Sequence, residues 1–303
     1  MFEQITIIGL GLIGSSIARG VREKGLAKRV IAADVSDEVC GIVAGLNIAD
    51  VVTQDLREAV QGSDCVIMAV PVGAFGAVAQ AIGPFLKAGA IVSDVGSVKA
   101  SVIAGAVPFF PDSVEFVPAH PIAGTEFSGP NAGFAELFEG RWCILTPTPE
   151  ASVKAVEKIS ALWEGIGARI EIMEPAHHDL VLGITSHLPH LIAYTIVGTA
   201  ADLEDDLQSE VIQFSASGFR GFTRIAASDP VMWRDVFLHN KDAVLEILGR
   251  FSEDLNAMKV AIERGDGDYL FEVFSKTRDI RKAIMELGPE GYPNPDRMKV
   301  EES

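Results

Sequence analysis

The apolar residues follow two different patterns along the chain, and the change lies near residue 172. Before it, short runs rich in Val, Ile and Ala alternate with segments in which apolar residues recur at helical spacing. Continuous apolar strands between helices are typical of a largely parallel sheet that is covered on both faces. The predicted strands are Gln4–Gly9, Arg29–Asp34, Cys65–Val70, Ala90–Asp94, Val114–Ala119, Trp142–Thr146 and Arg169–Met173. The predicted helices of this part include Ile13–Lys24, Gly73–Leu86 and Ser152–Ile166.

From about Pro175 onward, Val, Ile and Leu recur at helical spacing with no strand pattern between them. The apolar content exceeds what one helical layer needs, which indicates a buried subunit interface. We therefore predict an α/β domain over residues 1–174, an all-α domain over 175–288 and a tail without regular structure over 289–303. The predicted helical stretches are His178–Asp202, Pro230–Arg264 and Gly267–Leu287.

A glycine-rich turn follows the first predicted strand and opens the first helix. It reads Gly9-Leu-Gly11-Leu-Ile-Gly14. In such a turn Gly9 permits the tight bend, Gly11 lets a pyrophosphate approach the backbone, and Gly14 permits close packing of helix and strand. Leu12 and Ile13 begin the helix, whose free N–H groups and positive dipole end would face the phosphates. The turn therefore predicts a Rossmann-like dinucleotide site, with an ordinary βα turn as the alternative.

The residue that closes the second predicted strand indicates which dinucleotide binds. Asp34 lies about twenty residues beyond Gly14, where a carboxylate accepts hydrogen bonds from the adenosine ribose hydroxyls. No Arg or Lys occurs in the next four residues, Val35-Ser-Asp-Glu38, so a 2′-phosphate would meet only negative charge. We predict NAD as the cofactor, with NADP disfavoured.

Further candidate site residues lie at the ends of the later strands. Val70 and Pro71 end the third predicted strand, Ser97 follows the fourth, and His120 follows the fifth. Because ligands bind beyond the carboxyl ends of parallel strands, all four positions are expected on the cofactor side of the sheet. Three of these residues have a plainer interpretation as well: Pro71 as a strand terminator, Ser97 as a helix cap, and His120 as a hydrogen-bonded core histidine.

The net charge and the cysteine content indicate which classes of partner are disfavoured. The chain has 303 residues and a formal net charge of −17. Such a surface repels phosphate backbones and anionic lipid, which argues against nucleic acid and membranes as partners. Cys40, Cys65 and Cys143 lack metal-site or disulfide spacing and are interpreted as core residues of a cytoplasmic protein. The N-terminus has no basic leader, and the apolar run after it is too short to span a bilayer.

Five segments carry a more specific pattern, of which His-Pro-Ile-Ala-Gly-Thr-Glu and Ser-His-Leu-Pro-His are the most diagnostic. The segments are Gly9–Ser16, Asp94–Lys99, His120–Gly129, Ser186–His190 and Ser217–Trp233. Together they resemble the prephenate/arogenate dehydrogenase family, in its cyclohexadienyl dehydrogenase branch, over nearly the whole chain. The resemblance implies a Rossmann-like domain followed by a helical dimerisation domain. It also implies NAD-dependent oxidative decarboxylation of prephenate, arogenate or both, giving 4-hydroxyphenylpyruvate or tyrosine in tyrosine biosynthesis.

The resemblance also implies roles for single residues. His120 would accept the proton of the ring 4-hydroxyl, and Ser97 would share the contact with that hydroxyl. Arg224 would bind the substrate carboxylate, for which a guanidinium is well suited; a helix-capping or ion-pairing arginine is the alternative. Ser186 and His190 would line the pocket for the substrate side chain. Which of the two substrates is preferred stays open, because no residue decides between a keto group and an ammonium.

The resemblance implies roles for two further residues. Trp233 matches a tryptophan that reaches the site from the partner subunit of a homodimer, although alone it is typical of a core residue. Glu126 matches a member of an ionic gate that in relatives includes the arginine at position 224 and an aspartate. Here Gly221 replaces that aspartate, which puts gating and any feedback by tyrosine in doubt.

Other functions are compatible with parts of the sequence. A zinc site at His187 and His190 lacks a convincing third ligand, so no metal is predicted. A β-hydroxyacid dehydrogenase or a pyrroline-carboxylate-type reductase would share the domain plan without explaining the two diagnostic segments. A non-catalytic NAD-binding sensor is the alternative from another class.

Overall fold

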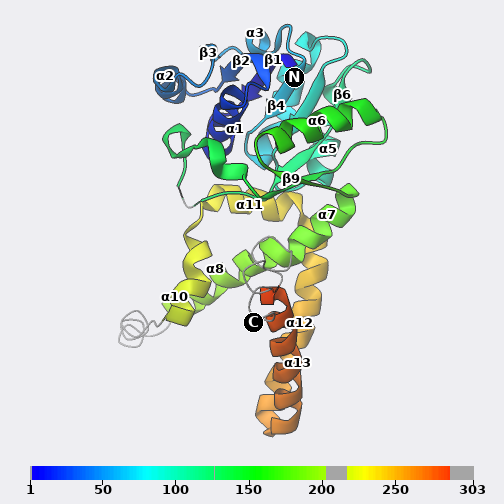
Figure 1. Cartoon of the computed structure of the whole chain (residues 1–303). Helices are drawn as coiled ribbons and strands as arrows, with labels where there is room; N and C mark the ends of the chain where they lie inside the picture. The colour runs from blue at the N-terminus through cyan, green and yellow to red at the C-terminus, as the bar shows by residue number, and fades with distance from the viewer. Residues whose placement is uncertain (1, 126, 203–216, 287–303) are drawn as a thin grey trace, which may run out of the picture. The chain divides into compact units, whose positions relative to one another are not determined.

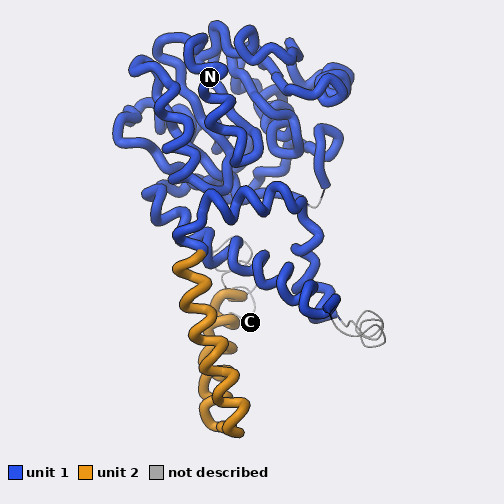
Figure 2. Tube along the Cα trace, turned by 180° about the vertical axis from the view of Figure 1, so that it is seen from behind, with its two compact units in different colours: residues 1–244 blue, residues 245–303 orange. Residues whose placement is uncertain are grey.

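The computed structural model of the chain describes residues 2–125, 127–202 and 217–286. Two compact units are distinguished, residues 1–244 and residues 245–303 (Figure 2). The first unit contains both β-sheets and the helices up to α11, and the second contains most of α12 and all of α13. The predicted tail 289–303 lies outside the described residues, as does Glu126.

The main sheet has six parallel strands in the order β3-β2-β1-β4-β5-β6 (Figure 1). Neighbouring residues of its central strands point to opposite faces. Ile5, Ile7 and Cys65 lie in one hydrophobic cluster, whereas Ile8 and Met68 lie in another. Burial on both faces explains why these strands are continuously apolar. The strands are β1 Phe2–Ile8, β2 Ala27–Ala33, β3 Val51–Thr53, β4 Cys65–Met68, β5 Ile91–Asp94 and β6 Glu115–Phe116.

Helices cover both faces, so the predicted Rossmann-like α/β fold is confirmed. Buried residues of α1 and α6 belong to the first cluster, and those of α3, α4 and α5 belong to the second. The short strand β3 and the helices α2, α3 and α5 were not among the elements predicted. The helices are α1 Leu12–Glu23, α2 Asp37–Leu46, α3 Leu56–Val60, α4 Phe75–Ile82, α5 Ala100–Ala106 and α6 Val153–Gly165.

The prediction of one strand at Val114–Ala119 is wrong, because the chain changes sheets within it. Val117 N–H still donates to Val92 of the main sheet at 2.9 Å. Pro118 has no N–H with which to continue that ladder, and its carbonyl oxygen accepts from Thr146 N–H instead. The chain thereby enters a second sheet of order β7-β8-β9, in which β7 and β8 are antiparallel and β8 and β9 parallel. Its strands are β7 Ala119–Pro121, β8 Trp142–Leu145 and β9 Arg169–Ile172.

The rest of the described chain is helical, as predicted, but two of the predicted stretches are interrupted. The first contains a π-helical turn at Gly183–His187, just before Pro189, which cannot donate to the preceding turn. The other is divided at Asn240 into two helices. The elements are α7 Pro175–Leu182, α8 Leu188–Ala201, α10 Ser217–Thr223, the 3₁₀ turn η7 Arg224–Ala227, α11 Pro230–His239, α12 Lys241–Arg264 and α13 Gly267–Glu286.

One helical stretch of the described chain, Pro175–Ala201, is long and apolar enough to cross a bilayer, with a mean hydropathy of 1.5. It nevertheless carries three buried polar side chains, His178, Asp179 and His187, and all three form hydrogen bonds within the first unit. These hydrogen bonds tie the first part of the stretch to the sheet domain.

Candidate active site

The glycine-rich turn between β1 and α1 is built so that side chains are excluded at two positions and space is left at a third. Gly9 has φ +90°, and a Cβ there would lie 2.4 Å from the carbonyl oxygen of Ala69. A Cβ at Gly14 would lie 1.8 Å from the carbonyl oxygen of Gly9. At Gly11 an added Cβ would meet no described atom within 4 Å. The first two glycines are therefore required by packing, while Gly11 leaves the backbone open to a ligand.

The N-terminus of α1 is available to an anion. No side chain caps it, and no acidic residue lies in its first turn, which begins with Leu12 and Ile13. Its N–H groups and positive dipole end therefore suit a phosphate. Val70 lies beside the turn, with Cγ1 3.0 Å from the position of a Cβ on Gly9, and Pro71 is exposed next to it.

Asp34 joins the glycine-rich turn to the loop after β2. Its Oδ2 accepts a hydrogen bond from Leu10 N–H at 2.8 Å, and its Oδ1 accepts one from Ser36 N–H at 2.9 Å. The adjacent Val35 is 81% exposed. The carboxylate is thus held in place with acceptor capacity left over. These features fit a dinucleotide with an unphosphorylated ribose.

His120 lies on β7 and is only 9% exposed. Its Nδ1 is 2.8 Å from Nε2 of His178. Burial, followed by the charges of His178, Lys99 and His187, holds the pKa of His120 well below its ordinary value of 6.5. The ring is therefore neutral near pH 7 and suited to accept a proton. Its Nε2 makes no hydrogen bond to any side chain or backbone group in the described ranges.

His178 and Asp179, on α7, are buried beside His120 and received no role in the sequence-based prediction. Asp179 Oδ1 lies 2.8 Å from Nδ1 of His178. The same carboxylate caps α5, because it accepts hydrogen bonds from Lys99 N–H at 2.8 Å and Ala100 N–H at 2.9 Å. Burial lowers the pKa of His178, although its hydrogen bond with Asp179 opposes this effect. In the sequence, the only sign of their role is that a histidine and an aspartate are adjacent shortly after Pro175. The residues that they contact are distant in the chain, so no local pattern predicts these contacts.

A buried ion pair fixes the strand that carries His120. Lys99 Nζ is fully buried and donates to Asp94 Oδ2 at 2.5 Å and to the carbonyl oxygen of Ala119 at 2.6 Å. Asp94 Oδ1 in turn accepts from Ala119 N–H at 3.1 Å. Both backbone groups of the residue preceding His120 are therefore bound by this pair. Burial raises the pKa of Asp94 and lowers that of Lys99.

His190 and Trp233 stack, with ring centroids 3.6 Å apart and planes 22° apart. His190 Nδ1 lies 2.8 Å from the carbonyl oxygen of Ser186. Arg224 is exposed at the start of η7. Burial lowers the pKa of His190, the hydrogen bond that His190 donates to the Ser186 carbonyl oxygen raises it, and the charge of Arg224 lowers it further. Ser186 thus meets His190 through its main-chain oxygen, and Arg224 acts on His190 through its charge. Trp233 is 7% exposed and belongs to the core of the same chain.

His187 is buried and contacts the edge of the same Trp233 ring. It is 1% exposed, and its Nδ1 lies 2.9 Å from Nδ2 of Asn240, which also donates to the main-chain oxygen of Asp179. Burial lowers the pKa of His187 to about 4. Within the described ranges, no group of three or more His, Cys, Asp or Glu is placed to hold a metal ion.

Ser97 is half-buried after β5, and its hydroxyl bonds to no group in the described part of the chain. The amides at the start of α5 are capped by Asp179, so the plainer interpretation of Ser97 as the cap of this helix does not hold. Glu126 lies outside the described residues, so its predicted position is not described here. Gly221 is exposed on α10, and an added Cβ would meet no described atom within 4 Å.

Two family models match the chain in succession. The model described as prephenate dehydrogenase, nucleotide-binding domain, matches residues 17–172. The model described as prephenate dehydrogenase, dimerization domain, matches residues 174–276. Together they cover most of the chain.

Similar curated proteins and solved structures agree with these matches. The cyclohexadienyl dehydrogenase of Zymomonas mobilis is 44% identical over 94% of this chain and 97% of its own length. The prephenate dehydrogenase of Bacillus subtilis is 34% identical over 94% of this chain and 76% of its own. The structure of Aquifex aeolicus prephenate dehydrogenase with hydroxyphenyl propionate and NAD+ has a TM-score of 0.87 at 33% identity, covering 94% of this chain and 99% of that one. A Mycobacterium tuberculosis 3-hydroxyisobutyrate dehydrogenase, at 15% identity and a TM-score of 0.53, shares the fold alone.

Proposed function

Because the chain belongs to the prephenate dehydrogenase family, we propose that it oxidises and decarboxylates prephenate, arogenate or both, with NAD as hydride acceptor. The products are 4-hydroxyphenylpyruvate or tyrosine, so the enzyme acts in tyrosine biosynthesis. The observation that carries the proposal in this chain is His120, a histidine kept neutral by burial at the start of the second sheet. The β-hydroxyacid dehydrogenase alternative is supported by the fold alone.

The chemistry divides between cofactor and protein. NAD, when bound, supplies the hydride acceptor; Gly9, Gly11, Gly14 and Asp34 would hold it, with the residues that flank the turn, Leu12, Ile13, Val70 and Pro71. His120 accepts the proton of the ring 4-hydroxyl as the carbon that bears this hydroxyl loses a hydride. The ring carboxylate leaves as CO2, its bonding pair enters the ring, and the oxygen regains the proton from His120. Gain of aromaticity drives the reaction, so the protein mainly orients the ring.

The remaining site residues bind the substrate in this proposal. Arg224 pairs with the substrate carboxylate and supplies a local positive potential in a protein of negative net charge. Ser97 shares the ring hydroxyl with His120. Ser186 and His190 line the side-chain pocket, an assignment supported by the effect of Arg224 on the pKa of His190.

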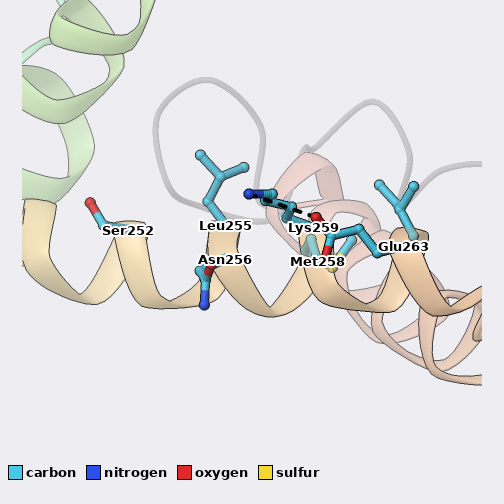
Figure 3. A pocket seen from close by; sticks show the side chains of 7 residues that line it. Ser252, Leu255, Asn256, Met258, Lys259 and Glu263 are labelled. Atoms are coloured by element: carbon cyan, nitrogen blue, oxygen red, sulfur yellow. Dashed lines mark ion pairs between the residues drawn. The ribbon is translucent and has the colours of Figure 1, made fainter.

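We also propose the domain and subunit organisation. The dinucleotide-binding domain would extend to about residue 174 and the helical dimerisation domain from 175 to 288, supported by the ranges that the two family models match. The second unit supports a homodimer, because its two helices expose Leu255, Ile262, Phe271, Phe274, Ile280 and Ile284. Side chains of α12 line a hollow of about 430 Å³ that includes Leu255, Met258 and Ile262 (Figure 3). A cytoplasmic location belongs to the same proposal, whereas Trp233 stacks on His190 within its own chain.

The decisive experiment is an assay of NADH formation with prephenate and with arogenate, each with NAD and NADP. We expect NADH, CO2 and the 4-hydroxyphenyl product in equal amounts, and a higher kcat/KM with NAD than with NADP. Absence of NADH with both substrates over the pH range of stability, in protein that still binds NAD, would instead support the sensor alternative.

A further inference from the structure

Two ionisable side chains of α7 are buried next to the proposed proton acceptor, and the proposed reaction does not use them directly. His178 is fully buried and Asp179 is 5% exposed. They stand in one row with His120: Asp179 Oδ1 is 2.8 Å from His178 Nδ1, and His178 Nε2 is 2.8 Å from His120 Nδ1. Burial of such groups is costly unless each is satisfied, which makes the arrangement of protons in the row specific.

The direction of each hydrogen bond in the row follows from Asp179, because its other two partners can only donate. Asp179 accepts from two backbone amides, Lys99 N–H and Ala100 N–H, which can only donate. A carboxylate is an acceptor only, so His178 donates to it through Nδ1. Burial lowers the pKa of His178, so the ring has a single proton near pH 7 and its Nε2 carries a lone pair.

The same reasoning continues to His120. Since His178 Nε2 is an acceptor, His120 must donate through Nδ1. Its own pKa is depressed by burial and by the charges that face it, those of His178, Lys99 and His187. A neutral His120 with its proton on Nδ1 has its lone pair on Nε2, the atom that makes no hydrogen bond within the described part of the chain.

We propose that Asp179 and His178 are positioning residues that fix the tautomer of His120, so that Nε2, and not Nδ1, is the atom that accepts the substrate proton. The inference deepens the proposed function and rests on it for the role of His120. In the other tautomer, Nε2 would carry a hydrogen and could not take the hydroxyl proton. The row also holds the imidazole ring in one orientation, because Asp179 is itself bound to the start of α5.

The tautomer can be observed directly. Nitrogen-15 spectra of histidine-labelled protein distinguish protonated from bare ring nitrogens, and a His120→Asn variant assigns the signals of His120. We expect His120 to be protonated at Nδ1 and bare at Nε2 in the wild type at slightly alkaline pH. A wild-type His120 protonated at Nε2 would overturn the proposal. This measurement needs no turnover, so it is separate from any failure of the proposed function.

Kinetic variants test the consequence. His178→Phe keeps a ring of similar size but removes both hydrogen bonds, whereas His178→Gln retains an acceptor for His120. We expect His178→Phe to lower kcat on the order of 10–100-fold, with little change in KM or in the Kd for NAD, and to shift His120 toward the Nε2-protonated form. His178→Gln should recover most of the loss. The matched control is His177→Phe at the exposed neighbouring position, which should leave kcat unchanged.

The outcomes separate the two proposals. If kcat of His178→Phe stays within about twofold of the wild type, the positioning role is wrong even though the enzyme is active. If His178→Phe does not fold, the glutamine variant and the wild-type spectrum still decide. If the wild type forms no NADH from either substrate, the proposed function fails, and the tautomer result stands on its own.

Discussion

His190 Nδ1 donates a hydrogen bond to the carbonyl oxygen of Ser186 at 2.8 Å. A carbonyl oxygen only accepts, so the neutral His190 ring has its lone pair on Nε2. That atom can accept from an ammonium but cannot donate to a keto oxygen unless the ring gains a second proton. The protonation state of His190 therefore bears on the choice between arogenate and prephenate.

The first prediction concerns this choice. Burial, and to a smaller degree the charge of Arg224, lower the pKa of His190 below 6.5, so the ring loses its second proton as the pH rises through that lowered pKa. We expect the ratio of kcat/KM for arogenate to that for prephenate to rise over the same interval and to be level above pH 6.5. His190→Gln, whose amide both donates and accepts, should make the ratio independent of pH. A ratio that falls with pH would contradict the assignment.

The second prediction concerns His120. His120→Asn removes the proton acceptor, and we expect kcat to fall on the order of 10²–10⁴-fold, while the Kd for NAD, measured by fluorescence titration, stays unchanged. In the wild type the ring must be neutral to act, and its pKa lies well below 6.5. Activity should therefore rise with pH only on the acid side of 6.5 and be constant near neutrality. Near-normal turnover of the variant would remove His120 from this role.

The third prediction concerns Arg224. Arg224→Gln keeps a polar side chain but shortens it and loses the charge and the paired donors, so KM for prephenate should increase strongly, with a smaller effect on kcat. The matched control is Arg220→Gln, another exposed arginine of the same helical segment, which should leave KM near the wild-type value. Equal effects of the two changes would indicate a general electrostatic contribution in place of a specific carboxylate contact.

The fourth prediction concerns cofactor choice. Replacing Asp34 with Ser and Val35 with Arg removes the carboxylate that would repel a 2′-phosphate and adds a guanidinium at an 81% exposed position. We expect the ratio of kcat/KM with NADP to that with NAD to rise at least about tenfold, equivalent to about 1.4 kcal/mol. Val35→Arg alone should give a smaller change, because Asp34 remains. Unchanged selectivity of the double variant would argue against the ribose contact.

The fifth prediction concerns stability in acid. Burial lowers the pKa of His187 to about 4 in the folded protein, whereas in the unfolded chain it titrates near 6.5. The unfolded form therefore binds the proton first, and stability is lost as the pH falls from about 6.5 to about 4, by roughly 3 kcal/mol for this residue. Urea unfolding at several pH values measures the loss. His187→Gln should be less stable at pH 7 yet lose less stability in acid; an unaltered pH dependence would show that His187 does not contribute.

Several features of the molecule follow from residues close together in the sequence. The glycine spacing of the turn at Gly9–Gly14 and the acidic residue at the end of β2 act within one strand-turn-helix unit, so their positions are fixed by local geometry. The change from strands to helices after β9 follows from the period of the apolar residues. These features were predicted without any knowledge of which elements pack together.

The amino-acid sequence by itself determined the α/β fold and the cofactor turn, because each depends on local conformation or on the pattern of apolar residues. The role of His120 rested on the resemblance to a family. Only the tertiary structure decided where the chain leaves the main sheet at Pro118, which helix caps α5, and that His178, itself bonded to Asp179, contacts His120. The physical reason is that a buried polar group is satisfied by whichever partner the packing brings within about 3 Å. Here those partners come from segments 58 and 80 residues apart in the chain, and no local pattern records such a pairing.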